Sequence, residues 1–250
     1  MSKIHHDVLA AAAQDALQAP SVLNTQPWRW RIDADVLELH ADRDRQLAVA
    51  DPDGRLLLLS CGAALHHARL AMAAAGWSAQ VRRLADSSPM IFWRASSWAH
   101  HRGELVRGAN RPSWSGGVPA GTTVRRVPRR VPVRELTLPL REGMQVQPGG
   151  DRGATYFVLF GDSDDAPDWL RAGEALSAVL LTAIALGLSV TPISDVIEVA
   201  HPRELVRGLL TGRGHPFIVL RRGLGAPTED LATVPRRDPA EVIRERSDRQ

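Results

Sequence analysis

The side chains best suited to holding a ligand lie in one short segment bracketed by Pro20 and Pro27. Ser21, Asn24 and Gln26 place a hydroxyl and two amides there, and these groups donate and accept hydrogen bonds without carrying charge. Prolines restrict the backbone, so such a turn could present its polar groups to a ligand at a small cost in side-chain entropy. The alternative is a helix exit in which the amides only satisfy backbone groups, and these residues alone favour that interpretation.

A helix must lead into this segment and a strand must leave it. Apolar residues recur at helical spacing from Val8 to Leu17, and Pro20 stops the pattern. Residues 28–32 then alternate as a half-buried strand does, and an Asp-Ala-Asp turn leads to a second strand at 37–40. The sequence therefore predicts that the polar segment lies between a helix and a β-hairpin.

Two long apolar helices are expected further along the chain. The first covers about residues 56–75 and ends at Gly76, and the second covers about 169–186 and ends at Gly187. A short helix should begin near Pro202. The remaining strands are expected at residues 77–84, 155–160, 188–193 and 217–220. Together these elements indicate an α+β fold.

The polar segment also carries a resemblance to a known family. Residues 19–28 read APSVLNTQPW and resemble the APS-x-x-N-x-Q-PW signature of nitroreductases. Residues 51–65 and 169–188 are similar to the Acg-like, dormancy-associated FMN-binding branch of that superfamily, as are 192–194 and 221–223. The resemblance covers about two thirds of the chain. It implies a nitroreductase-like sandwich, with a mainly antiparallel sheet flanked by helices.

The resemblance further implies FMN as a non-covalent cofactor and NAD(P)H as the electron donor. A flavin carries the hydride itself while the protein positions and polarises the ring, so no catalytic side chain is assigned. In nitroreductases each FMN lies between two copies of the fold, and the long Acg-like proteins contain both copies in one chain. The implied cofactor-binding residues are Pro20, Ser21, Asn24 and Gln26 from one half, Pro192, Ile193 and Ser194 near the ring, and Arg221 near the phosphate.

The chain departs from its long relatives between about residues 87 and 98. There the long members carry the rest of the first half and an Arg-Thr-x-x-Arg helix that supplies phosphate contacts and part of the interface. A homodimer that completes the site in trans is one expected consequence. Loss of the flavin is another.

Three functions follow from the resemblance. The first is an oxidoreductase that passes hydride from NAD(P)H through FMN to a small-molecule substrate. The second is a protein that sequesters FMN without turning it over, and the third is a degenerate family member without flavin. An open pocket and ping-pong kinetics would favour the enzyme, a covered pocket would favour storage, and a colourless purified protein would favour the third.

Other classes of site find little support. Histidine pairs occur at 5–6, 66–67 and 100–101, but none has the spacing of a metal site, and no HExxH or CxxC motif is present. A nucleophile elbow (GxSxG) and a phosphate-binding loop (GxxxxGK[ST]) are also missing from the sequence. The predicted metal content is therefore none.

Composition sets the remaining expectations. The net charge is only +3 although the pI is about 9.9, because nearly all basic residues are arginine, so no nucleic-acid partner is expected. Cys61 is the only cysteine and the N-terminus resembles no signal peptide, which favours the cytoplasm. Residues 175–193 carry no charge, but Gly187 and Pro192 interrupt them, so a buried helix and strand are expected and no membrane partner.

A single domain is expected over residues 1–225. Within it, about residues 102–153 form an excursion rich in Arg, Pro and Gly, which is expected to be a solvated loop. Apolar residues become sparse beyond Gly225, so residues 226–250 are expected to be a loose polar tail.

Overall fold

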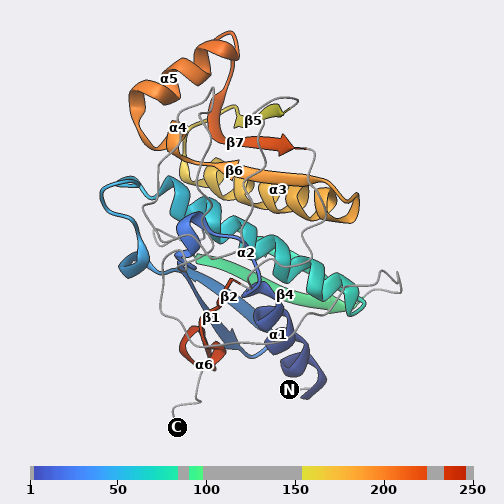
Figure 1. Ribbon diagram of the computed structural model, residues 1–250. Helices are drawn as coiled ribbons and strands as arrows, with labels where there is room; N and C mark the ends of the chain where they lie inside the picture. The colour runs from blue at the N-terminus through green and yellow to red at the C-terminus, as the bar shows by residue number, and fades with distance from the viewer. Residues whose placement is uncertain (1–2, 84–89, 98–153, 224–233, 246–250) are drawn as a thin grey trace, which may run out of the picture.

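A pair of long helices separates two β-sheets in the computed structural model of the chain, which describes residues 3–83, 90–97, 154–223 and 234–245 (Figure 1). The five-stranded sheet has the order β3-β4-β2-β1-β8, and the three-stranded sheet has the order β5-β7-β6. Helix α2 packs on α3 between the sheets. The expected α+β class is confirmed, but the single sheet expected from the sequence is replaced by two sheets, one on either side of the helices.

The first half of the fold contains the predicted helices, hairpin and strand in order, together with a strand at Met90–Ser97 that the sequence did not predict. The bounds are α1 Lys3–Ala16, η1 Val22–Asn24, β1 Trp28–Asp33, β2 Val36–Ala41, η2 Arg43–Arg45, α2 Arg55–Ala74, β3 Trp77–Arg82 and β4 Met90–Ser97. The predicted hairpin is confirmed, because β1 and β2 pair antiparallel from Trp28 opposite Ala41 to Asp33 opposite Val36. Trp28 and Trp30 alternate with half-buried neighbours and pack into the core, as a strand with one covered face requires.

The second half also confirms its predicted helices and strands. The bounds are β5 Thr155–Gly161, α3 Ala166–Ala185, β6 Ser189–Ile193, α4 Asp195–Glu198, α5 Ala200–Leu209 and β7 His215–Gly223. Asp165 begins α3, because its side chain accepts a hydrogen bond from the Asp168 backbone N–H at 3.0 Å. Within the described residues 154–223, the single turn of α4 is the one helix that the sequence did not predict.

The two long helices approach each other at a pair of glycines. A Cβ atom added to Gly62 would lie 2.9 Å from the Cα of Gly173, and one added to Gly173 would lie 2.8 Å from the Cα of Gly62. Farther along, the buried carboxylate of Glu174 on α3 pairs with Arg69 at 2.5 Å and with Arg83 at 2.6 Å. Backbone contact and these ion pairs therefore join the two halves.

The expected polar tail is wrong for residues 234–245. Helix α6 (Pro239–Val242) and strand β8 (Ile243–Glu245) follow one another there, and β8 pairs parallel with β1, with Ile243 opposite Trp30. Val242 has no exposed surface and belongs to the main core. We call residues 235–245 the C-terminal strap. No sequence pattern indicates the strap, because it contains few apolar side chains. Backbone pairing and polar contacts hold most of it in place.

The helix and strand expected at residues 175–193 form as α3 and β6, but β6 and the end of α3 are mostly exposed, so their predicted burial is wrong. The predicted excursion at about residues 102–153 lies outside the described residues. Helix α2 is long and apolar enough to cross a membrane, but 72% of its most apolar window is buried inside the structure. The core helix of a soluble protein passes the same test, so this helix is weak evidence for a membrane span.

Candidate functional site

The signature segment forms a tight turn between α1 and β1. Three of its residues adopt a left-handed backbone, with φ of 46° at Leu23, 55° at Asn24 and 47° at Gln26. Asparagine tolerates this region, whereas leucine and glutamine rarely adopt it. Such residues cost about 1–3 kcal/mol each and persist only where their surroundings impose them. The surrounding structure therefore imposes on the turn a backbone conformation that its residues do not prefer.

Part of this hold comes from the first half of the chain. The Oγ of Ser21 accepts a hydrogen bond from the Gln26 backbone N–H at 2.9 Å, which closes the turn on itself. The Val22 N–H donates to the Oγ of Ser60 on α2 at 3.2 Å. Ser60 has almost no exposed surface, so this bond ties the turn to the central helix.

The rest comes from the C-terminal strap. The side-chain amides of Asn24 and Gln26 both donate to the carbonyl oxygen of Pro235, at 3.1 and 3.2 Å. The Gln26 Oε1 accepts the Arg237 backbone N–H at 2.9 Å, and the Asn24 Oδ1 accepts from the Arg236 guanidinium at 3.1 Å. The two amides that the resemblance assigns to FMN thus bind the chain itself.

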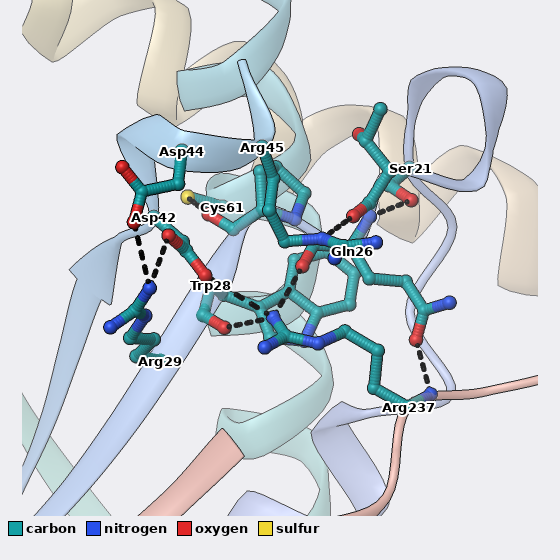
Figure 2. Close-up of polar contacts among 11 residues, drawn as sticks. Ser21, Gln26, Trp28, Arg29, Asp42, Asp44, Arg45, Cys61 and Arg237 are labelled. Atoms are coloured by element: carbon teal, nitrogen blue, oxygen red, sulfur yellow. Dashed lines mark hydrogen bonds and ion pairs between the residues drawn. The ribbon is translucent and has the colours of Figure 1, made fainter. Parts of the chain in front are cut away.

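The Arg237 side chain runs beneath the turn (Figure 2). Its Nη1 donates to the carbonyl oxygens of Gln26 and Trp28, both at 3.2 Å, and lies 3.4 Å from an oxygen of Asp42. Asp42 also pairs with Arg29 at 2.9 Å. Burial lowers the pKa of Arg237, and the neighbouring Arg side chains add to this while Asp42 opposes it. A buried guanidinium and carboxylate therefore support the base of the turn.

The other predicted cofactor residues lie in the three-stranded sheet. Pro192 and Ile193 end β6, and Arg221 on β7 stands opposite Thr191. Ser194 precedes α4, and its hydroxyl donates to Glu198 at 2.9 Å. The predicted residues therefore form two groups, one at the α1–β1 turn and one on β6 and β7, and their role toward FMN stays a prediction.

Exposure decides which of these residues can touch a ligand. Pro192 is exposed, and Ser21 and Arg221 are half-buried, so all three side chains are accessible to a ligand. Gln26 has 0% exposed surface, and Asn24 has only 8%. In this structure, Gln26 supports the turn from inside instead of facing a ligand.

Sequence reasoning missed the strap residues at this site. Arg236, Arg237 and the Arg237 partner Asp42 were not singled out, because paired arginines in a polar stretch usually indicate solvated surface. One signal was present in the sequence. Asp238 followed by Pro239 is a helix start, and the Asp238 side chain accepts the Ala240 N–H at 2.9 Å.

The histidine pair on α2 belongs to the helix interface. Ser177 Oγ on α3 lies 2.9 Å from the Nδ1 of His66 and 3.0 Å from the Nδ1 of His67, which also donates to the Ala63 carbonyl. Burial lowers the pKa of His66 and raises the pKa of the Cys61 thiol to about 12. Within the described part of the chain, no group of His, Cys, Asp or Glu residues could hold a metal ion.

The half-buried His67 makes stability depend on pH. Burial lowers its pKa to about 4, whereas an unfolded histidine titrates near pH 6.5. Between these values the unfolded state binds more protons, so the free energy of unfolding should fall as the pH drops from about 6.5 to about 4, by at most about 3 kcal/mol. Urea denaturation of the wild type and of His67→Gln across this window tests it. The variant should lose part of the pH dependence, whereas His201→Gln, on the exposed surface of α5, should keep all of it.

Comparison with known proteins shows the family. No protein-family model matches the chain. A putative NAD(P)H nitroreductase of Mycobacterium tuberculosis (Rv3131) is 33% identical over 305 aligned positions, covering 91% of this chain and 88% of that protein. The putative NAD(P)H nitroreductase acg of the same organism is 30% identical, with 96% of each chain covered. The chain therefore belongs to the nitroreductase superfamily, in its Acg-like branch, and at the level of the family it is a nitroreductase-type oxidoreductase.

The same comparison shows that the chain is internally shortened. The share of 91% corresponds to about 228 of 250 residues, so about 77 of the 305 aligned positions have no counterpart here. These gaps lie inside the aligned region and not beyond its ends. That the shortening falls near residues 87–98 stays a prediction.

Proposed function

We propose that the protein binds FMN non-covalently and passes hydride from NAD(P)H through it to a small-molecule acceptor. The observation that carries this proposal is the turn at residues 19–28. The segment keeps the signature of the family and folds into a strained backbone that two separate parts of the chain hold in place. Strain of this kind gathers at ligand-binding and catalytic sites.

The chain's own residues would bind and orient the cofactor. FMN, when bound, supplies the group that accepts and donates hydride. The exposed ring of Pro192 would give apolar contact, and the hydroxyl of Ser21 would give a polar one. Arg221 would pair with the phosphate, because a planar guanidinium matches two phosphate oxygens at once.

The first test is the absorbance spectrum of purified protein after incubation with FMN and desalting. We expect retained flavin bands in the blue and near-ultraviolet, and bleaching of these bands when NAD(P)H is added without oxygen. If the protein retains flavin that NAD(P)H does not bleach, the result would indicate an FMN-storage protein and not an enzyme. A colourless protein with no measurable FMN affinity would mean that the fold remains without its cofactor, and the proposal would fail.

A matched pair of arginines tests the phosphate contact in the same assay. Neighbouring residues of a strand point to opposite faces of the sheet, so Arg221 and Arg222 on β7 cannot both face one phosphate. Arg221→Gln should weaken FMN binding about tenfold, a loss of about 1.4 kcal/mol, and should leave the binding of riboflavin, which has no phosphate, unchanged. Arg222→Gln should change neither. Equal losses in both variants would contradict the assignment.

We propose that a second copy of the chain covers an exposed apolar surface on β5 and α3. Large apolar side chains are exposed on β5 and near the end of α3, namely Phe157, Phe160, Ile184 and Leu186. Exposed apolar groups of this size are frequent at interfaces between subunits. Gel filtration of the flavin-bound protein should show a dimer, and elution as a flavin-bound monomer would contradict this arrangement.

A further inference from the structure

The C-terminal strap holds the strained turn from a distance of more than two hundred residues along the chain. The Pro235 carbonyl oxygen accepts hydrogen bonds from the side-chain amides of Asn24 and Gln26. The Arg237 backbone N–H donates to the side-chain oxygen of Gln26. The Arg236 guanidinium donates to Asn24 and also, at 3.0 Å, to the carbonyl oxygen of Gln18 at the end of α1. Two of the three left-handed residues of the turn are thus bonded to the strap through their side chains.

The strap is itself anchored at its far end. Strand β8 pairs with β1, which begins immediately after the turn. Val242 is fully buried in the main core, so the strap cannot detach without exposing part of that core. The Arg237 guanidinium also donates to the carbonyl oxygen of Gln26, where the turn ends, and to that of Trp28, where β1 begins. The same segment therefore fixes the turn and the strand that continues from it.

We propose that the C-terminal strap preorganises the turn at residues 21–26 for cofactor binding, with Arg236 and Arg237 as positioning residues. This inference rests on the proposed function, because it concerns the same site. Binding energy is lost when a ligand must first order the groups that receive it. The strap orders the turn during folding, so Ser21 stands in place before FMN arrives.

The opposite arrangement would be a strap that covers the site and must leave before FMN can enter. The contacts favour positioning, because Arg237 is buried and donates to the carbonyl oxygens of Gln26 and Trp28 at the base of the turn, whereas Ser21 stays half-exposed. The two arrangements predict effects of opposite sign. A positioning strap makes FMN binding weaker when it is loosened, and a covering strap makes it stronger.

The test loosens the strap in three ways and keeps one matched control. The variants are Arg236→Met, Arg237→Met and a chain that ends at Val234, and the control is Arg244→Met, which removes an exposed arginine from β8 in the same strap. FMN affinity is measured by titration below the melting temperature of each protein. Hydrogen exchange of the backbone N–H groups of residues 21–28 is measured without FMN.

We expect the dissociation constant of FMN to rise about tenfold or more in the two arginine variants and further in the shortened chain. Exchange should quicken at residues 21–28 and stay unchanged at Ile218 on β7, which a general loss of stability would not spare. Arg236→Met keeps the buried pair of Arg237 with Asp42, so it separates positioning from misfolding. Arg244→Met should match the wild type.

Three results would overturn the inference. Unchanged FMN affinity in Arg236→Met and Arg237→Met, with FMN bound by the wild type, would mean that the strap does not position the turn. Tighter binding in the shortened chain would show a covering strap instead. A wild type that binds no FMN would remove the proposed function and this inference together, which distinguishes that outcome from the first two.

Discussion

Replacing Gly62 or Gly173 by alanine is expected to destabilise the protein by about 3 kcal/mol, because each glycine lies against the backbone of the opposite long helix. The added methyl group of Gly173→Ala would lie 2.8 Å from the Cα of Gly62 and closer still to the carbonyl oxygen of Leu59. Backbone cannot change rotamer to make room, so the helices must move apart. Overpacking a well-packed core typically costs about 1–3 kcal/mol, and contacts this short belong at the upper end.

The measurement is urea denaturation of both variants against a third glycine substitution. Gly208 lies in α5 with no atom within 4 Å of an added Cβ, so Gly208→Ala should be neutral or stabilise by about 0.5–1 kcal/mol. Similar midpoints for Gly173→Ala and the wild type would show that the α2–α3 contact is loose. The separation of the two sheets by these helices would then need revision.

Local patterns predicted most of the individual elements. The apolar run after Arg55 and the glycine that ends it identified α2, and alternation at residues 28–32 identified β1. These signals are local, because the spacing of neighbouring side chains determines which face a helix or a strand can bury. Most helices and strands were therefore predictable within a few residues of their observed bounds, whereas β4 was not predicted.

The assembly of these elements was not predictable in the same way. That the strands divide into two sheets depends on how α2 and α3 pack, and Gly62 and Gly173 reveal this contact only when the helices are seen together. Strand β8 is short and lies among charged residues, so no periodicity marks it. It forms because β1 offers an open edge and Val242 has a core to enter.

The candidate site was found only in part for a related reason. The signature segment and Ser21 could be read from the sequence through the resemblance. The positive φ at Leu23 and Gln26, neither of which is glycine, gave no sequence signal, because local preference argues against it. The partners that impose this backbone lie in the strap, and a contact across two hundred residues leaves no trace in a single sequence.

Asp42→Asn is expected to destabilise the protein by about 3–5 kcal/mol and to loosen the base of the candidate site. The Asp42 side chain is 3% exposed and the Arg237 side chain is 8% exposed, so their ion pair is buried. Removing the carboxylate charge leaves the Arg237 guanidinium without its buried counter-ion, and such losses typically cost about 3–5 kcal/mol. Urea denaturation gives the loss, and hydrogen exchange at residues 21–28 shows whether the turn loosens with it.

The neighbouring Asp44 provides the matched control, because it contacts the same Arg29 at 3.1 Å but is 87% exposed. An exposed pair is worth about 0–1 kcal/mol, so Asp44→Asn should be close to neutral. Equal small effects of both substitutions would show that solvent stabilises the Arg237 charge when Asp42 is neutral. The hydrogen bonds of the guanidinium to Gln26 and Trp28 would then be enough to support the turn. A large effect of Asp42→Asn alone would show that the turn at residues 21–26 depends on one buried ion pair between residues that are 195 positions apart in the chain.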